Sequence, residues 1–220
     1  MRRMAIKYKV SRTTIARKVA YLGEQARLKN NLWRKGNTFF NIQFDDLETI
    51  EHSKLKPVTV TLLVDHKRKI IDFAIARIPA KGHLAKLSRK KYGPRPSEAG
   101  KARDDLFKRV APFIEPKTLI ESDEHPHYPY LIKKYLPKAD YQCFKGDKAC
   151  ISGQGELKKT KFDPLFRINH TLAMLRANVN RLIRRTWNTT KALRGLESHL
   201  HMYMLYHNQV LTPQESKLEF

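Results

Sequence analysis

The chain is poor in cysteine and in long apolar runs. Its two cysteines, Cys143 and Cys150, are too few for a disulfide framework or a four-cysteine zinc site, and a reducing cytosol suits them best. No stretch approaches the roughly 20 apolar residues that span a bilayer, and the first residues lack the apolar run of a signal peptide. We therefore expect an intracellular, cytoplasmic protein with no membrane segment.

Acidic residues are also scarce. The 220 residues include 21 Asp and Glu against 44 Lys and Arg, which gives a formal net charge of +23. Such an excess predicts a polyanionic partner, and it does not distinguish DNA from RNA. Hydrophobic residues make up 41% of the chain, enough for the ordinary core of one sizeable domain with a small appendage.

Residues 1–23 are typical of two short helices around a turn, the second capped by Ser11. Its apolar face carries Ile15, Val19 and Leu22, and its other faces carry Arg12, Arg17 and Lys18. This pattern resembles a recognition helix of a helix-turn-helix; a basic surface helix is the alternative. A helix-turn-helix packs three helices and this one begins inside the second, so we expect that sequence is missing upstream. Residues 24–38 are interpreted as a basic linker.

The central part of the chain predicts a β-rich block followed by alternating elements. Strands are expected at residues 39–50, 58–64, 70–78 and 117–122, and helices at residues 97–112, 164–185 and 189–207. Residues 81–96 and 146–161 are expected to be irregular. Three strands, a helix, a strand and further helices form the element order of the ribonuclease-H-like fold. We therefore predict an α/β domain over residues 39–210, with a mixed sheet flanked by helices, and a C-terminal tail at 211–220.

Two acids stand at the boundaries of apolar strands. Asp45 follows Phe44 in the first predicted strand, with Asp46 as a rival for the same role, and Asp123 ends the fourth. The first and fourth strands are neighbours in this fold, so two carboxylates would lie side by side. Carboxylates placed in this way repel each other unless a divalent cation lies between them, and oxygen ligands suit Mg²⁺ or Mn²⁺. The alternative is that each Asp accepts backbone hydrogen bonds at a turn or strand end.

The last third of the chain carries a family resemblance. Residues 168–176 (INHTLAMLR) and 181–187 (RLIRRTW) resemble the catalytic helix of small bacterial insertion-sequence transposases, in which an acid precedes a basic residue by seven positions. Asn169 and Arg176 occupy those two positions here. The run FDDL at 44–47, with Lys54 beyond it, and Asp123, followed by Tyr128 and Pro137, resemble the family's first two acidic motifs. The resemblance covers residues 39–208.

The resemblance implies a DDE-type site formed by Asp45, Asp123 and Asn169, which would hold Mg²⁺ or Mn²⁺, with Arg176 contacting phosphate near the scissile bond. An asparagine carbonyl coordinates Mg²⁺ without adding charge, so metal affinity should be weaker than with Glu. Asp163 is a less favoured substitute for the third acid. The side chains expected to bind DNA are Arg12, Arg17, Lys18, Arg181, Arg184 and Arg185.

By this resemblance the protein would be a transposase that binds double-stranded DNA at the terminal inverted repeats of an insertion sequence. It would cleave the ends and join their 3′-hydroxyls to target DNA, as a homo-oligomer on the bacterial nucleoid. One alternative is a catalytically decayed, DNA-binding relative that acts as an inhibitor, which Asn169 and the short N-terminal segment favour. Another is a structure-specific nuclease or an RNA-acting protein of the same fold.

Overall fold

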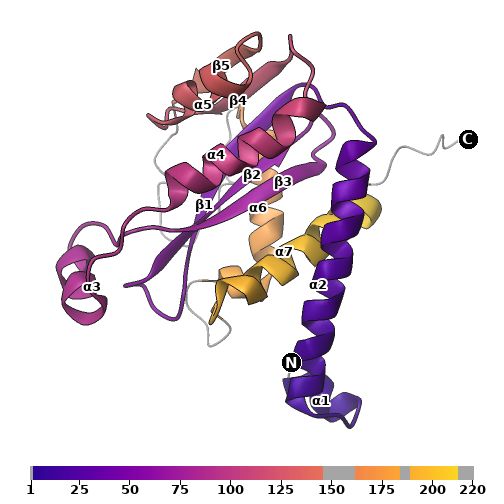
Figure 1. The fold of residues 1–220 in the computed structure, drawn as a ribbon, viewed down its shortest axis with the longest axis vertical. Helices are drawn as coiled ribbons and strands as arrows, with labels where there is room; N and C mark the ends of the chain where they lie inside the picture. Colours follow the sequence, from indigo (N-terminus) through magenta and orange to yellow (C-terminus); the bar gives the residue numbers. More distant parts are fainter. Residues whose placement is uncertain (1, 146–161, 184–188, 213–220) are drawn as a thin grey trace, which may run out of the picture.

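A five-stranded sheet lies at the centre of the computed structural model, which describes residues 2–145, 162–183 and 189–212 (Figure 1). The strands are β1 (Ile42–Ile50), β2 (Pro57–Val64), β3 (Ile70–Arg77), β4 (Leu119–Asp123) and β5 (Asp140–Phe144). Their order in the sheet is β3-β2-β1-β4-β5. Strand β2 is antiparallel to both β1 and β3, whereas β4 runs parallel to both β1 and β5. Strand β1 is therefore hydrogen-bonded on both sides.

Helices cover both faces of the sheet, because both faces carry apolar side chains. The covering helices are α4 (Ala99–Val110) and α5 (Tyr128–Tyr135) on one face, and α6 (Phe166–Asn178) and α7 (Leu193–Tyr206) on the other. We call these the α4 face and the α6 face. The predicted α/β architecture with a mixed, helix-flanked sheet is confirmed, and it is compatible with a ribonuclease-H-like fold.

The predicted apolar stripe of the third long helix is buried against the sheet. Its members Ile168, Leu172, Leu175, Val179 and Leu182 all belong to the core of the α6 face. The α-helix is shorter than expected, since α6 ends at Asn178 and Val179 leaves helical geometry with φ −107° and ψ 89°. A short 3₁₀ turn, Asn180–Leu182, then keeps Leu182 in the core. The last part of the predicted helix, residues 184 and 185, lies outside the described residues.

The N-terminal segment differs from its prediction in length. Helix α1 (Arg2–Lys7) and the Ser11 cap are present, with the Thr14 N–H donating to Ser11 Oγ at 3.0 Å. Helix α2 (Arg12–Lys35), however, continues through most of the predicted linker. The reason is packing on α7: a Cβ on Gly23 would lie 2.5 Å from Ser198 Cβ, so glycine permits the close approach. The buried Asn30 amide donates to the His201 carbonyl at 2.9 Å.

Three elements were not expected from the sequence. Helix α3 (Leu84–Tyr92) lies in the stretch predicted to be irregular. It was missed because its sequence is mostly basic and has only a weak apolar pattern. After β4, helix α5 leads to strand β5, and β5 pairs in parallel with β4 at the edge of the sheet. Strand β5 is largely exposed and short, so its sequence lacks the apolar signature of a buried strand.

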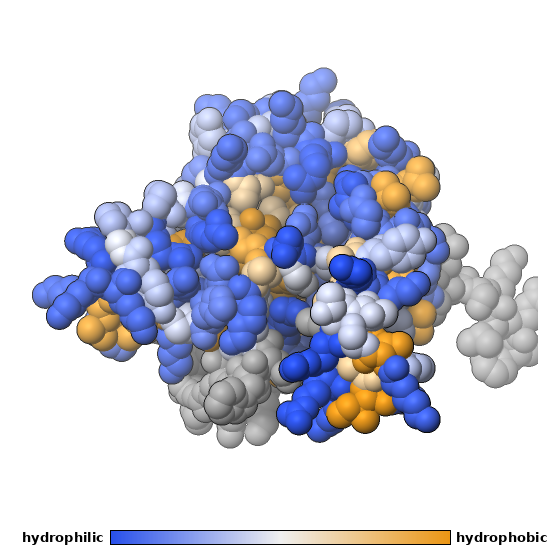
Figure 2. All heavy atoms as spheres, turned by 60° about the horizontal axis from the view of Figure 1, so that its bottom comes forward, coloured by the Kyte–Doolittle hydropathy of each residue, from blue (hydrophilic) through white to orange (hydrophobic). Residues whose placement is uncertain are grey.

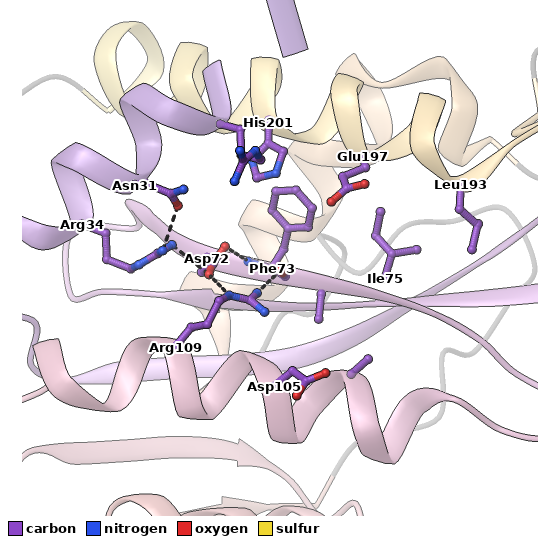
Figure 3. A pocket seen from close by; sticks show the side chains of 13 residues that line it. Asn31, Arg34, Asp72, Phe73, Ile75, Asp105, Arg109, Leu193, Glu197 and His201 are labelled. Carbon is purple, nitrogen blue, oxygen red and sulfur yellow. Dashed lines mark hydrogen bonds and ion pairs between the residues drawn. The ribbon is translucent and has the colours of Figure 1, made fainter. Parts of the chain in front are cut away.

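A buried ion-pair network attaches α2 to the sheet (Figure 3). Arg34 of α2 and Arg109 of α4 both reach the Asp72 carboxylate of β3, at 2.8 and 3.2 Å. The Arg34 and Asp72 side chains are only 8% and 5% exposed. A pocket of about 520 Å³ opens beside this network between α2, β3, α4 and α7, and His201 lines it. Removing one partner of such a buried pair costs more than the pair itself contributes, so the network fixes the position of α2.

Hydrophilic side chains cover most of the face shown in Figure 2, with some hydrophobic ones among them. Met4, Ile6 and Val10, at the N-terminal end of the chain, are among the exposed hydrophobic residues. Within the described ranges, every helix is too short or too polar to cross a membrane.

The buried imidazole of His201 predicts a pH-dependent loss of stability. Burial lowers the pKa of His201 to about 4 from an ordinary value of 6.5. Between those two pH values the unfolded chain takes up a proton on this ring that the folded protein does not. The free energy of unfolding therefore falls as the pH drops from 6.5 to 4, by about 3 kcal/mol for this one group. Urea unfolding across this window should show a shallower fall in a His201→Gln variant, and parallel curves for the two proteins would contradict the assignment.

Candidate acidic site

The two rival acids of β1 point to opposite faces of the sheet. Asp45 pairs with Leu62 across β2, and Leu62 belongs to the core of the α6 face. Asp46 pairs with Thr61 instead and points to the α4 face. Side chains alternate along a strand, so neighbouring positions cannot serve the same site.

Asp46 is held in place by a buried cation. Its carboxylate forms an ion pair with Arg103 of α4 and accepts a hydrogen bond from the Thr61 hydroxyl. The Arg103 and Asp46 side chains are 7% and 14% exposed. The Arg103 guanidinium also lies over the ring of Tyr128, 5.3 Å from its centroid. Asp46 therefore neutralises a buried arginine and secures α4 on the sheet.

Asp123 ends β4 in partly buried surroundings. Its carboxylate accepts a hydrogen bond from the His125 N–H at 3.1 Å. Burial raises the pKa of Asp123, and the negative charge of Asp46 raises it further, against the opposing effect of that hydrogen bond. Burial also lowers the pKa of His125, as does the nearby Arg103. A positive charge placed beside Asp123 would offset the cost of keeping this carboxylate ionised.

Gln43 brings three segments of the site together. Its amide Nε2 donates to Glu121 of β4 at 2.9 Å and to the Pro164 carbonyl at 2.7 Å. Its Oε1 accepts the N–H of Ile168, in the first turn of α6, at 3.1 Å. Arg167 adds an ion pair to Glu121 and donates to the Asn41 carbonyl at 2.8 Å. The start of α6 is thereby fixed over the junction of β1 and β4.

Asp45 and Asp123 follow this junction at equal distances along their strands. Asp45 lies two residues beyond Gln43 and Asp123 two residues beyond Glu121, and these two reference residues are register partners in parallel strands. Strand alternation would give Asp45 and Asp123 the same face as Gln43 and Glu121, but the charges that act on Asp123 include those of Asp46 and Arg103, which form their ion pair on the α4 face. Asp45 and Asp123 therefore lie on neighbouring strands, and Asp46 is an acid of β1 whose charge acts on Asp123.

Asn169 follows directly after Ile168, at the same end of α6. Its amide Nδ2 donates to the Asp163 carboxylate at 2.8 Å. Asp163, the weaker candidate for the third acid, also accepts the N–H of Leu165 at 3.0 Å. Arg176 lies seven residues further along α6 and is partly buried. The third position is therefore occupied by an amide that is hydrogen-bonded to a neighbouring carboxylate.

The residues present suit a divalent cation in part. Two carboxylates and an amide oxygen are hard ligands of the kind that Mg²⁺ and Mn²⁺ prefer. Within the described parts of the chain, no three His, Cys, Asp or Glu side chains form a group that could hold a metal ion. A site of Asp45, Asp123 and Asn169 would therefore have two charged ligands, and its affinity would depend on the amide.

Predicted DNA-binding residues fall in two regions. Arg12, Arg17 and Lys18 are exposed on the N-terminal half of α2, and Arg181 lies in the turn after α6. Arg184 and Arg185 lie outside the described residues. The sequence reasoning missed Arg103, although its position in an apolar stripe with Ala99, Leu106 and Val110 was a signal. A charged residue in such a stripe needs a buried partner, which here is Asp46.

Comparisons with known proteins add no family. No protein-family model matches the chain, and no curated protein matches it significantly. Function is therefore inferred from the chemistry of the site.

The different environments of the two acids predict different effects on stability. Replacing Asp46 by Asn leaves the buried Arg103 without its charged partner, so the free energy of unfolding should fall by about 3 kcal/mol. Asp45→Asn should cost clearly less, because an asparagine oxygen can still accept the hydrogen bond that Asp45 Oδ1 takes from the Asp46 N–H. Urea denaturation followed by circular dichroism measures both. Equal losses in the two variants would show that their roles are not separate.

Proposed function

We propose that this protein is a metal-dependent DNA strand-transfer enzyme of the transposase type, built on a ribonuclease-H-like domain. The observation that carries the proposal is the parallel pairing of β1 and β4 at Gln43 and Glu121, because Asp45 and Asp123 follow two residues further along these two neighbouring strands. A strongly basic chain has little reason to keep two carboxylates together unless a cation holds them. The net charge of +23 favours a polyanionic substrate.

Asp45, Asp123 and the amide oxygen of Asn169 would hold Mg²⁺ or Mn²⁺. When bound, such ions activate a water or a DNA 3′-hydroxyl for attack on phosphorus and stabilise the leaving oxygen. The chain's own residues provide orientation: Gln43 joins the three segments that carry the ligands, and the Arg103 ion pair holds the Asp46 carboxylate in place. Arg176 would contact a phosphate near the scissile bond, two helical turns from Asn169.

The N-terminal segment would contribute to DNA binding. The turn between α1 and α2 and the exposed Arg12, Arg17 and Lys18 support a helix-turn-helix-like role for residues 1–23 on duplex DNA. Pairing two ends of an insertion sequence would require a homo-oligomer on the nucleoid. The DNA would comprise the terminal inverted repeats and the target.

A second candidate function is a catalytically decayed relative that binds DNA without cutting it. The observation that favours it is the asparagine at the third ligand position: its Nδ2 donates to Asp163, which leaves only the uncharged Oδ1 to coordinate a cation. Asparagine also brings no negative charge to bind a divalent cation. In this case the protein would compete with an active transposase for the same DNA ends.

A cleavage and strand-transfer assay on DNA that carries the element's ends separates these functions. In Mg²⁺ or Mn²⁺ the wild-type protein should act, whereas Asp45→Ala and Asp123→Ala should each lose at least about a hundredfold in rate, because each removes a metal ligand. Asp104→Ala, an exposed acid of α4, is the matched control and should retain activity. Equal activity in all four proteins would remove the assignment. An inactive wild type whose activity is restored by Asn169→Glu would support decay.

A further inference from the structure

Strand β3 lies at the edge of the sheet, so only one side of its backbone is hydrogen-bonded to another strand, β2. In an antiparallel pair, residues whose N–H and C=O point toward the neighbouring strand alternate with residues whose groups point away from it. The N–H of Ile78 donates to the Pro57 carbonyl at the start of β2, so Ile78 points toward β2. Phe73, Ile75 and Arg77 therefore direct their backbone groups to the outer side of the sheet.

Two of these three residues have hydrogen-bond partners for their outward-facing groups. The Phe73 N–H donates to the Asp72 carboxylate at 2.9 Å, and the Phe73 carbonyl accepts from Arg109 at 3.2 Å. The Arg77 N–H donates to the Glu98 carboxylate at 3.3 Å, and the Arg77 carbonyl accepts the Glu98 N–H at 2.9 Å. Capping of this kind keeps an edge strand from pairing with other chains.

The capping extends to the start of β3, and Ile75 is the exception. The Asn208 amide donates to the Ile70 carbonyl at 2.9 Å, and its oxygen accepts the Ile70 N–H at 2.8 Å. Among the residues that the structure describes, no group pairs with the outward-facing N–H and C=O of Ile75, which lies between the capped Phe73 and Arg77. One donor and one acceptor, side by side, are therefore left for an incoming backbone.

Ile75 faces the pocket of about 520 Å³ between α2, β3, α4 and α7 (Figure 3). The lining near it is apolar, with Ala102 of α4 and Leu193 of α7. Ile75 itself is only partly buried. Because Phe73 and Arg77 are capped, the edge offers backbone pairing to one residue of an incoming chain and not to a whole strand. The opening therefore suits a short extended segment.

Two carboxylates flank Ile75 from opposite faces of the sheet. Glu197 comes from α7 and Asp105 from α4, and Figure 3 shows Ile75 between them. Within the described ranges neither carboxylate forms an ion pair or a hydrogen bond, although the charge of Glu197 acts on Arg27. The chain has only 21 acidic residues against 44 Lys and Arg, so two acids without a close cation are unusual in it. Their charges favour a basic ligand.

The alternation of an extended chain matches the placement of the two acids. A residue paired with Ile75 directs its side chain to the same face as the Ile75 side chain, which is the face of α7 and Glu197. The next residue directs its side chain to the opposite face, toward α4 and Asp105. The two arginines that contact Asp72 lie at the α2 end of the pocket. Two consecutive basic residues in an extended segment therefore fit the Ile75 end.

We propose that the open edge of β3 at Ile75 docks an extended segment of a partner protein that carries two consecutive basic residues. The backbone of the first basic residue exchanges two hydrogen bonds with Ile75, and the two basic side chains meet Glu197 and Asp105. The proposal rests on the edge of β3 and its pocket, and is independent of Asp45 and Asp123 and of the proposed function.

The test is a titration of isotope-labelled protein with an acetylated hexapeptide, followed by NMR at low salt. The two central residues of the peptide are lysine and arginine, flanked by valine and threonine. The Ile75 amide signal should shift saturably, because its N–H gains an acceptor. A peptide N-methylated at both central residues should bind at least about tenfold more weakly, because it has lost the donor to the Ile75 carbonyl. Equal binding of the two peptides would overturn pairing with the edge of β3.

The acids are tested with the double variant Asp105→Asn/Glu197→Gln. It should bind the peptide about fivefold more weakly at low salt, the effect of losing two partly exposed ion pairs. The matched control Glu115→Gln/Asp140→Asn removes the same charge from exposed positions outside the pocket, and should bind as the wild type does. Thermal unfolding followed by circular dichroism checks that both double variants are folded. Equal affinities in the two folded variants would overturn the proposal.

Two further titrations separate other occupants from a partner segment. The wild type is diluted without peptide, and a concentration-dependent shift of the Ile75 amide would identify a second copy of this chain as the occupant instead. A short DNA duplex is added in the same way, and a shift of this amide equal to that caused by the peptide would assign the site to nucleic acid. Neither shift is expected. No metal and no cleavage step enter these measurements, so failure of the proposed enzyme function leaves their outcome unchanged.

Discussion

The hydrogen bonds of the Gln43 side chain are the constraint on which the site depends. One amide joins β1, β4 and the start of α6 through Glu121, the Pro164 carbonyl and the Ile168 N–H. The group is buried, so water cannot replace these partners without cost. Asp45, Asp123 and Asn169 follow these contacts in the three segments. The junction therefore determines where the three residues lie.

Because side chains alternate along β1, the adjacent acids Asp45 and Asp46 point to opposite faces of the sheet. Asp46 neutralises the buried Arg103 and so stabilises the packing of α4, whereas Asp45 faces the helix that carries Asn169. A second buried network, Arg34 with Asp72, secures α2 at the opposite edge of the sheet. Most of the excess positive charge is left at the surface, where it can meet a polyanion. The buried ion pairs thus stabilise the fold, whereas the cations at the surface are available for binding.

Much of the sheet could be predicted from the sequence, because β1, β2 and β3 have long apolar or alternating patterns. The stripe from Ile168 to Leu182 likewise predicted a buried helix face. Helix α2 was underestimated because its C-terminal half is basic, and only the Gly23 contact with Ser198 shows why it continues. Strand β5 was missed since an exposed edge strand needs no apolar side chains.

The candidate site was predictable only in part. The positions of Asp45 and Asp123 at apolar strands suggested a pair, but sequence spacing could not decide between Asp45 and Asp46, because both faces of β1 are covered. Nor could spacing show the ion pair of Asp46 with Arg103, which lies 57 residues away in the chain.

The central claim is that Asp45 and Asp123 together hold one divalent cation. Titration of the DNA-free protein with Mn²⁺, followed by electron paramagnetic resonance of the free ion, measures that site directly. The account predicts saturable binding that weakens at least about tenfold in both Asp45→Asn and Asp123→Asn, and that is unchanged in Asp104→Asn. Binding that is equally strong in all of these proteins, or no saturable binding in the wild type, would contradict it.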